Sequence, residues 1–506
     1  MKHSLHIAST LFVTVGFAAA SLARAQAPSL AETYKPAADK LIAASLADPE
    51  GYANLAWLCD HIGKRVSGSD SLLKAIAWAT DLMKKDGLAN VHTQAATVPH
   101  WVRGEESGEI VAPVARKLHL LGLGMSVATP PEGITAQVVV VPNFAALTKL
   151  GKAGVAGKIV VFNAPYEGYG RTVMYRTAGP SQAAALGAVG VLVRSITPLA
   201  VQLPHTGTTS YDETRPKIPA AAISLEDAMM LDRLQAEGAP VKVHFQMQAH
   251  LEAPQTAANV MGDIVGSEHP EQIVVIGGHI DSWDVGQGAQ DDGSGIMATL
   301  AAVREIQKLG LKPRRTIRIC FWVNEENGGA GGKAYRAALS DAELKNHVAA
   351  IEMDGGAEPP TGFGYGAAPG GLPGSGPGSG RRRAAPGDPV ATAPGPGLSP
   401  DEEHSLALLR DIGTLLTSVL TEMPGTEPIR PGGGGSDISP LMADGVPGLG
   451  ETTTGQHYFD WHHTEADTLD KVNPEDFRRN VASLAVMTFI LADMPDRLEG
   501  HKGAGE

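Results

Sequence analysis

The chain has 506 residues, of which 43% are hydrophobic and 19% charged, as is ordinary for a globular protein with more than one domain. Asp and Glu outnumber Lys and Arg by 55 to 41, and this acidic balance argues against a nucleic-acid partner. Two cysteines, Cys59 and Cys320, make no disulfide framework. A single bridge between them stays open, but two small buried side chains are the favoured interpretation.

The N-terminus has the pattern of a secretory signal peptide. Lys2 and His3 precede an apolar run over residues 7–20, and Ala23-Arg-Ala25 supplies a cleavage site. The run is too short to anchor the chain across a bilayer, and no other stretch is long and apolar enough. We therefore expect residues 1–25 to be removed, which leaves a secreted or periplasmic protein without a membrane span. Its net charge is then −16, because the basic residues fall from 41 to 39 against 55 acids.

The mature chain divides into three predicted parts. Residues 26–125 begin a first domain, with helical spacing of apolar residues over 32–86. Residues 126–252 are predicted to be a separate inserted α/β unit, and residues 253–506 complete the first domain. The insert is marked by β-branched runs and a short helix, predicted at 137–141, 158–162, 181–186 and 189–193.

The last part alternates short apolar strands with helices, which is typical of a mostly parallel central sheet flanked by helices. The predicted fold class is therefore α/β. A segment over 359–400, rich in Gly, Pro, Ala and Ser, interrupts the alternation and is predicted to be a flexible loop. The strands are predicted at 272–276, 316–323 and 348–353, and the helices at 293–309 and 474–492.

Acidic and imidazole side chains follow the predicted strands repeatedly. Each has an ordinary interpretation as a turn, a helix start or a solvated pair. Together they predict a metal site, because ligands gather at the carboxyl ends of parallel strands and these groups suit zinc. The residues concerned are His279, Asp281, Asp291, Asp292, Glu325, Glu326 and Asp354, with His462 and His463 in a late loop.

Two-metal hydrolases need a carboxylate that bridges the ions and a base that is not a ligand. The adjacent Glu325 and Glu326 can supply ligand and base from one short loop, although spacing alone leaves their order open. Asp281 lies two residues past His279 and is placed to accept a hydrogen bond from the imidazole, which would fix its tautomer.

Four strings around these residues resemble the co-catalytic zinc aminopeptidase and glutamate carboxypeptidase family. They are Gly278-His-Ile-Asp-Ser-Trp-Asp284, Gln290-Asp-Asp-Gly-Ser-Gly295, Asn324-Glu-Glu-Asn327 and His463-Thr-Glu-Ala-Asp-Thr468. The likeness covers nearly the whole mature chain. The further segments are Val98-Pro-His-Trp-Val-Arg-Gly-Glu-Glu-Ser107, Gly122-Leu-Gly124, Thr129-Pro-Pro-Glu-Gly-Ile-Thr135, Arg171-Thr-Val-Met-Tyr-Arg-Thr177 and Pro204-His-Thr-Gly207.

The resemblance implies an exported exopeptidase with two zinc ions per chain that acts on unblocked dipeptides or short peptides. It implies that Glu325 is the general base and that Asp281 orients His279. It also implies that the insert is a protease-associated-like domain and that the protein is a homodimer. The implied metal ligands are His279, Asp291 and Asp354 for one zinc, and Asp291, Glu326 and His463 for the other.

Two features depart from the family pattern. The predicted loop over 359–400 is longer and begins five residues after Asp354. The run Phe459-Asp-Trp-His462 leaves the oxyanion-stabilising residue open between Tyr458 and His462. The alternative functions are an aminopeptidase on longer peptides, a glutaminyl cyclase with one zinc, and a non-enzymatic binding protein of the same fold that has lost its metals.

Overall fold

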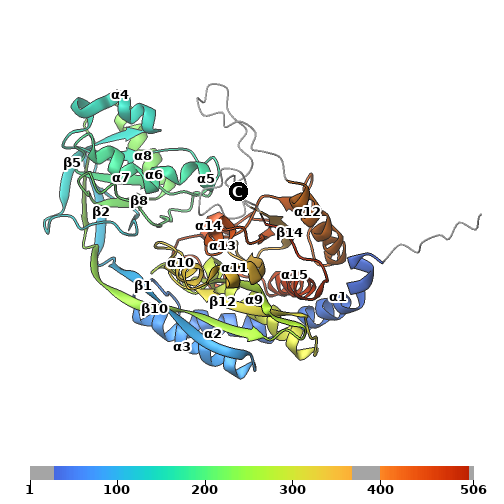
Figure 1. Cartoon of the computed structure of the whole chain (residues 1–506). Helices are drawn as coiled ribbons and strands as arrows, with labels where there is room; N and C mark the ends of the chain where they lie inside the picture. Colours follow the sequence, from blue (N-terminus) through green and yellow to red (C-terminus); the bar gives the residue numbers. More distant parts are fainter. Residues whose placement is uncertain (1–27, 367–398, 501–506) are drawn as a thin grey trace, which may run out of the picture.

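The computed structural model describes residues 28–366 and 399–500 (Figure 1). The predicted signal peptide and most of the predicted loop over 359–400 lie outside these ranges. Within them, no helix combines the length and the apolar composition that a membrane crossing needs. The chain forms two eight-stranded sheets with flanking helices, so the predicted α/β class is confirmed. Cys59 and Cys320 are both buried free thiols.

The first sheet is parallel at its centre, with antiparallel pairs β1–β10, β10–β12 and β16–β14 outside the centre and a parallel pair β14–β15 at one edge. β11 (His269–His279) pairs in parallel with β12 (Arg315–Trp322) and with β13 (His347–Glu352). β13 in turn pairs in parallel with β16 (Gly448–Thr453). The order across the sheet is β1-β10-β12-β11-β13-β16-β14-β15. The remaining strands are β1 (Ala89–Val102), β10 (His250–Ile264), β14 (Pro360–Tyr365) and β15 (Ile429–Pro431).

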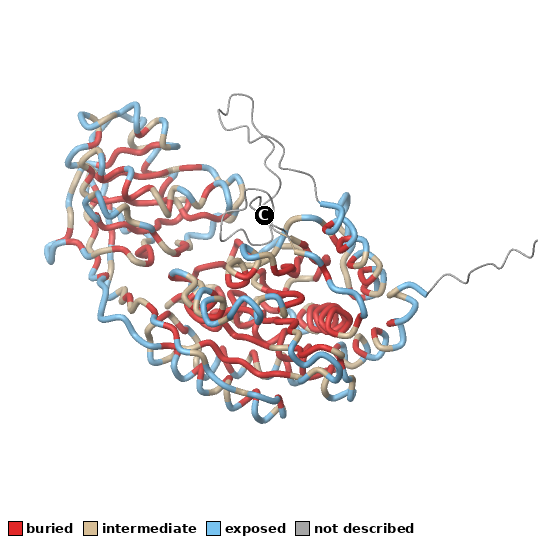
Figure 2. Tube along the Cα trace, in the orientation of Figure 1, coloured by how far each residue is buried: buried red, intermediate tan, exposed pale blue. Residues whose placement is uncertain are grey.

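Helices cover both faces of this sheet, because its central strands are apolar on both sides. Along β11, Val274 and Ile276 pack into the larger core, whereas Ile273 and Val275 pack into a smaller core on the opposite face. Figure 2 shows a buried centre, with the exposed residues gathered along the outer segments. The larger core includes α1 (Leu30–Ala47), α2 (Glu50–His61), α3 (Asp70–Lys85), α9 (Ser294–Lys308), α12 (Pro400–Gly413) and α15 (Pro474–Asp493), and the smaller core includes α10 (Ala330–Ala337), α11 (Asp341–Asn346) and α13 (Ser439–Ala443).

A second unit, residues 106–247, is built around the second sheet, and the long strands β1 and β10 connect it to the rest of the chain (Figure 1). Its strand order is β3-β2-β9-β5-β6-β7-β8-β4. It begins before the predicted insert boundary at 126, because β2 pairs with β9 and β4 with β8. The strands are β2 (Glu106–Ala112), β3 (Arg116–Lys117), β4 (Leu120–Gly122), β5 (Ile134–Val141), β6 (Ile159–Phe162), β7 (Gly190–Arg194), β8 (Ala220–Ile223) and β9 (Lys242–Met247). The helices are α4 (Phe144–Val155), α5 (Tyr169–Thr172), α6 (Met174–Thr177), α7 (Gly179–Ala184) and α8 (Leu225–Ala236).

Two other segments differ from the sequence prediction. The helical pattern over 32–86 is divided into α1, α2 and α3, because the Asp48 carboxylate accepts the Glu50 and Gly51 N–H groups and so starts a new helix. The predicted loop over 359–400 starts too early, because its first residues form the buried strand β14. Gly362 makes this possible, since a Cβ there would lie 1.8 Å from the Pro428 carbonyl oxygen.

Candidate metal centre

A first group of ligand atoms lies at the carboxyl ends of the parallel strands. His279 is the last residue of β11, and Asp354 lies two residues past the end of β13. The His279 Nε2 atom lies 3.2 Å from Asp291 Oδ1 and 3.5 Å from Asp354 Oδ1. These three residues offer ligand atoms that all lie within 4.8 Å of one another, which is the spacing that a single bound ion requires.

A second group lies on the other side of Asp291. The Asp291 Oδ2 atom is 3.2 Å from His463 Nε2, and Glu326 Oε2 is 3.1 Å from that same nitrogen. His462 also approaches, with its Nε2 atom 3.6 Å from Asp291 Oδ2 and its ring stacked on that of His463. Asp291, His462 and His463 form a compact ligand group, so either Glu326 or His462 is a geometric candidate for the third position.

The side chain of Asp291 is fixed by the backbone around it. It lies in the turn Ala289–Gly293 before α9, and its peptide bond to Asp292 is cis. The Asp467 carboxylate accepts the N–H groups of Ala289, Gln290 and Asp291 at 3.1, 2.7 and 3.2 Å. The Asp292 carboxylate accepts the His279 N–H at 3.0 Å, which ties this turn to the end of β11.

Asp281 contacts His279 mainly through its backbone. The His279 Nδ1 atom lies 3.0 Å from the Asp281 carbonyl oxygen and 3.7 Å from its carboxylate. The carboxylate instead accepts the Glu325 N–H at 3.1 Å and the Ser67 hydroxyl at 3.2 Å. Asp281 therefore links the loop after β11 to the loop that carries the two glutamates.

The two adjacent glutamates differ in exposure and contacts. Glu326 is buried and directs its carboxylate at His463, whereas Glu325 is only half-buried. The loop reverses sharply at Asn324 and Gly329, which adopt φ values of 70° and 66°. Glu326 therefore faces the ligand group while Glu325 keeps partial access to solvent.

The buried carboxylates of this group would be stabilised in their charged form by a bound cation. Burial and the nearby Asp291 carboxylate raise the pKa of Glu326 to about 8, and burial raises the pKa of Asp354 to about 6. Burial alone would lower the pKa of His279, but the Asp354 and Asp291 carboxylates raise it well above its usual value. Among the described residues, Glu326 Oε1 has no hydrogen-bond partner although it is buried. Oxygen and imidazole donors with an unmatched buried oxygen fit a divalent ion such as zinc.

Several residues at this site escaped the sequence analysis. The buried guanidinium of Arg65 donates to the carbonyl oxygens of Ile280, Gln287 and Gly288 at 2.7, 2.9 and 3.0 Å, and so shapes the loop after His279. Asp467 lies inside one of the strings that resemble the family, and its spacing from His463 was a usable signal. Arg65 stands alone between two helices, and nothing in the sequence pattern marks it.

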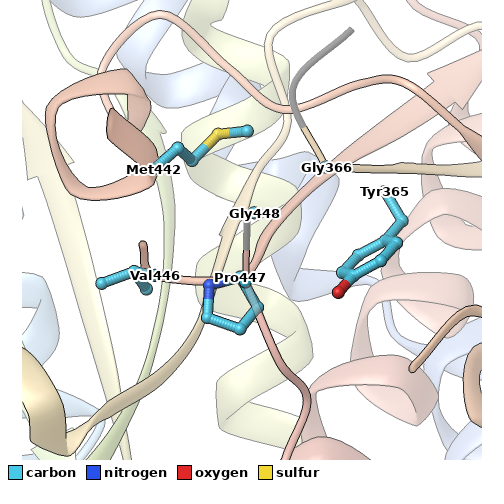
Figure 3. A pocket seen from close by; sticks show the side chains of 7 residues that line it. Tyr365, Gly366, Met442, Val446, Pro447 and Gly448 are labelled. Atoms are coloured by element: carbon cyan, nitrogen blue, oxygen red, sulfur yellow. The ribbon is translucent and has the colours of Figure 1, made fainter. Parts of the chain in front are cut away.

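A hollow with a different lining lies beside the ends of β14 and β16 (Figure 3). It is lined by Tyr365, Gly366, Met442, Val446, Pro447, Gly448 and Gly500. These residues include no carboxylate or imidazole, so the hollow offers no metal ligands of the kind found around Asp291.

Comparisons with known proteins give the family of the chain. Residues 259–488 match the model for Peptidase family M28. Human carboxypeptidase Q is 37% identical over 457 residues, which cover 89% of this chain and 87% of that protein, and the Xenopus laevis protein is 37% identical over 92% and 91%. A Peptidase M28 precursor from Shewanella amazonensis SB2B is 30% identical, with a TM-score of 0.81 over 92% of this chain and 98% of that one. An aminopeptidase from Aneurinibacillus sp. strain AM-1, 22% identical with a TM-score of 0.61 over the same shares, has the same fold.

The chain therefore belongs to peptidase family M28 and is a zinc metallopeptidase. The predicted resemblance and the predicted enzyme class are confirmed. Within that class, the chain is a metallo-exopeptidase similar to carboxypeptidase Q over most of its length.

Proposed function

We propose that this enzyme is a di-zinc exopeptidase that hydrolyses unblocked dipeptides or short peptides. The observation that carries the proposal is the position of Asp291, which faces His279 with Oδ1 and His463 with Oδ2. A carboxylate with one oxygen toward each ligand group is what two ions about 3.5–4 Å apart require.

The proposed ligands follow from the two groups. Asp291 is shared. Glu326 is favoured over His462 as the third ligand of the second ion, because its Oε1 atom is buried and has no hydrogen-bond partner among the described residues. When bound, zinc at these residues would supply a Lewis acid for the scissile carbonyl and would lower the pKa of the attacking water. The full set is His279, Asp291 and Asp354 for the first ion, and Asp291, Glu326 and His463 for the second.

Glu325 is the proposed general base. The Glu325 N–H donates to the Asp281 carboxylate at 3.1 Å, which fixes the backbone from which the Glu325 side chain extends. Glu325 is only half-buried, so a water can reach it. It takes a proton from the attacking water and delivers a proton to the leaving amine.

For the oxyanion we favour His462 over Tyr458. Burial and the neighbouring His463 lower the pKa of His462 well below its usual value, so its imidazole is a neutral N–H donor. Its Nε2 atom lies at the site, 3.6 Å from Asp291 Oδ2.

The second unit is the proposed protease-associated-like domain. Its contacts with residues at the site support the proposal that the substrates are short. Tyr169 of this unit stacks on Phe459 with ring centroids 5.0 Å apart and meets the His462 ring edge-on at 5.0 Å. Tyr169 and Phe459 therefore pack against His462, next to the ligand group. The preference for free termini is inferred from the similarity to carboxypeptidase Q.

The test is a screen of free and end-blocked dipeptides with metal analysis of the same sample. We expect two zinc ions per chain and much faster cleavage of free dipeptides than of N-acetylated ones. Fully active enzyme with one zinc, or equal rates on N-acetylated dipeptides, would contradict the proposal.

We also propose that the enzyme is exported and forms a homodimer. N-terminal sequencing of protein recovered outside the cytoplasm should find Gln26 at or near the first position, and an intact Met1 would contradict export. Light scattering of the purified enzyme should give twice the mass of the chain, and a monomer mass would contradict the dimer.

A further inference from the structure

One short segment of the second unit contacts both loops that carry ligands of the proposed second ion. Residues 205–209 lie between β7 and β8 and reach the loop of Glu326 and the loop of His463. The inference drawn from them rests on the proposed function, because it concerns the second of the two proposed ions.

The first contact is between the backbone of Thr206 and His463. The Thr206 N–H donates to the His463 carbonyl oxygen at 3.0 Å, and the Thr206 carbonyl oxygen lies 3.3 Å from His463 Nδ1. When Nε2 binds an ion, Nδ1 carries the proton and donates it to this carbonyl. The Arg176 guanidinium donates to the same carbonyl at 3.0 Å and so holds it in place.

The approach depends on a glycine. Gly207 has a φ of 129°, and a Cβ there would lie 2.2 Å from Arg176 Nη1 and 2.7 Å from His463 Nδ1. His463 itself has a φ of 62°, which is uncommon for a residue with a side chain. A side chain at position 207 would therefore collide with Arg176 and His463, so the close approach of the segment requires glycine. His463 keeps an unfavourable backbone conformation at this contact.

The second contact is between Thr208 and the glutamate loop. The Thr208 hydroxyl donates to the Glu326 carbonyl oxygen at 2.6 Å and lies 3.2 Å from Asn327 Oδ1. The residue next to it, Thr209, makes a similar bond that stays inside the second unit, from its hydroxyl to the Arg176 carbonyl oxygen at 3.0 Å.

We propose that Thr206, Gly207 and Thr208 are positioning residues for the second zinc, so that the affinity for this ion, unlike that for the first, depends on the second unit. Thr208 fixes the backbone of Glu326, and Thr206 fixes the ring of His463. His279 and Asp354 are held by their own sheet and by the turn around Asp291.

The test compares zinc binding by three variants with that of the wild-type enzyme. Each protein is stripped of metal and titrated with zinc against a competing chelator, which yields two stepwise dissociation constants. Thr208→Val keeps the shape of the side chain and removes the hydroxyl, so we expect the second zinc to bind about 10–100-fold more weakly with the first unchanged. Thr208→Ser restores the hydroxyl and should restore the affinity, and Thr209→Val is the matched control that should bind both ions normally.

Glu326→Ala identifies which constant belongs to the second ion, and thermal melting confirms that each variant is folded. If Thr208→Val binds both ions as the wild type does, the inference is wrong while the proposed function stands. Equal weakening by Thr208→Val and Thr209→Val also overturns it, because the effect is then not specific to the glutamate loop. A wild-type enzyme that binds a single zinc overturns the proposed function and this inference with it.

Discussion

The two halves of the metal centre are built in different ways. His279 and Asp354 extend from the ends of adjacent parallel strands, β11 and β13, in the middle of the buried sheet. Glu326 and His463 lie in irregular loops and contact the second unit through hydrogen bonds over long sequence separations. Asp291 is common to both halves.

The difference teaches what each half depends on. The first half follows from the packing of the sheet, which the apolar strands stabilise in any case. The second half needs a left-handed backbone at His463, which costs of the order of 1–3 kcal/mol and persists only when the surroundings enforce it. We therefore expect the first zinc to be tightly held and the second to respond to changes in the second unit.

The largest effect is expected where the halves meet. Asp291→Ala removes the shared carboxylate, so zinc content should fall from two ions to none and activity should be lost. Glu326→Ala, as the matched variant, should keep one zinc. Elemental analysis of both purified variants makes the comparison, and an Asp291→Ala enzyme that retains both ions would refute the bridging role.

Glu325→Gln separates catalysis from metal binding. Gln has nearly the same shape but cannot accept the proton, so kcat should fall about 10²–10⁴-fold, or roughly 3–5 kcal/mol of barrier, with both zinc ions present. Steady-state kinetics with metal analysis provides the measurement. Loss of zinc in this variant but not in Glu326→Gln would mean that the two glutamates have exchanged roles.

A smaller effect is expected from the ion pair between Arg103 and Asp284. Arg103 lies in the connection between β1 and the second unit and also donates to the Gly122 carbonyl oxygen of that unit. Arg103 donates to the Asp284 carboxylate through two nitrogens, at 2.7 and 2.6 Å, and both side chains are largely buried. Asp284→Asn removes the nearer of two carboxylates that pair with this guanidinium, since Glu106 Oε1 lies 3.6 Å from Arg103 Nη1, and we expect the second zinc to bind about 10-fold more weakly. Asp212→Asn, which breaks an exposed ion pair with Arg215 inside the second unit, should leave both constants unchanged. A change in the first constant alone would contradict the division of the site.

The last effect is on folding stability and concerns the sheet that carries the first half. Burial lowers the pKa of His347, at the start of β13, from 6.5 to about 4, so the folded protein keeps this ring neutral. As the pH falls from about 6.5 toward 4, the unfolded chain binds a proton that the folded protein does not, and stability is lost. The loss from this group at pH 5 is about 2 kcal/mol. Urea unfolding at pH 7 and pH 5 should show a smaller decrease for His347→Gln than for the wild type, and equal decreases would contradict the assignment.

The sequence predicts the first half of the site better than the second. Periodicity places the strands that end near His279 and Asp354, and the rule that ligands gather at strand ends brings these residues together. His463 lies in a late loop, so only the family resemblance connects it with Asp291. Thr206 and Thr208 were not foreseen at all, because backbone geometry between two separate units creates their contacts.

Pairing between distant segments also explains the errors in the fold. The second sheet begins at Glu106 and not at 126, because β2 pairs with β9, which lies more than a hundred residues later in the chain. Pro360–Tyr365 looked like part of a flexible segment by composition, yet its glycines let β14 pack closely against its neighbours. Composition describes a segment by itself and contains no information about the partner strand.

The most direct test of the account is the position of the zinc ions in crystals of the loaded enzyme, located by anomalous scattering at the zinc edge. The account predicts two peaks about 3.5–4 Å apart, each about 2 Å from a different oxygen of Asp291. A single peak, or two peaks that do not share Asp291, would contradict it.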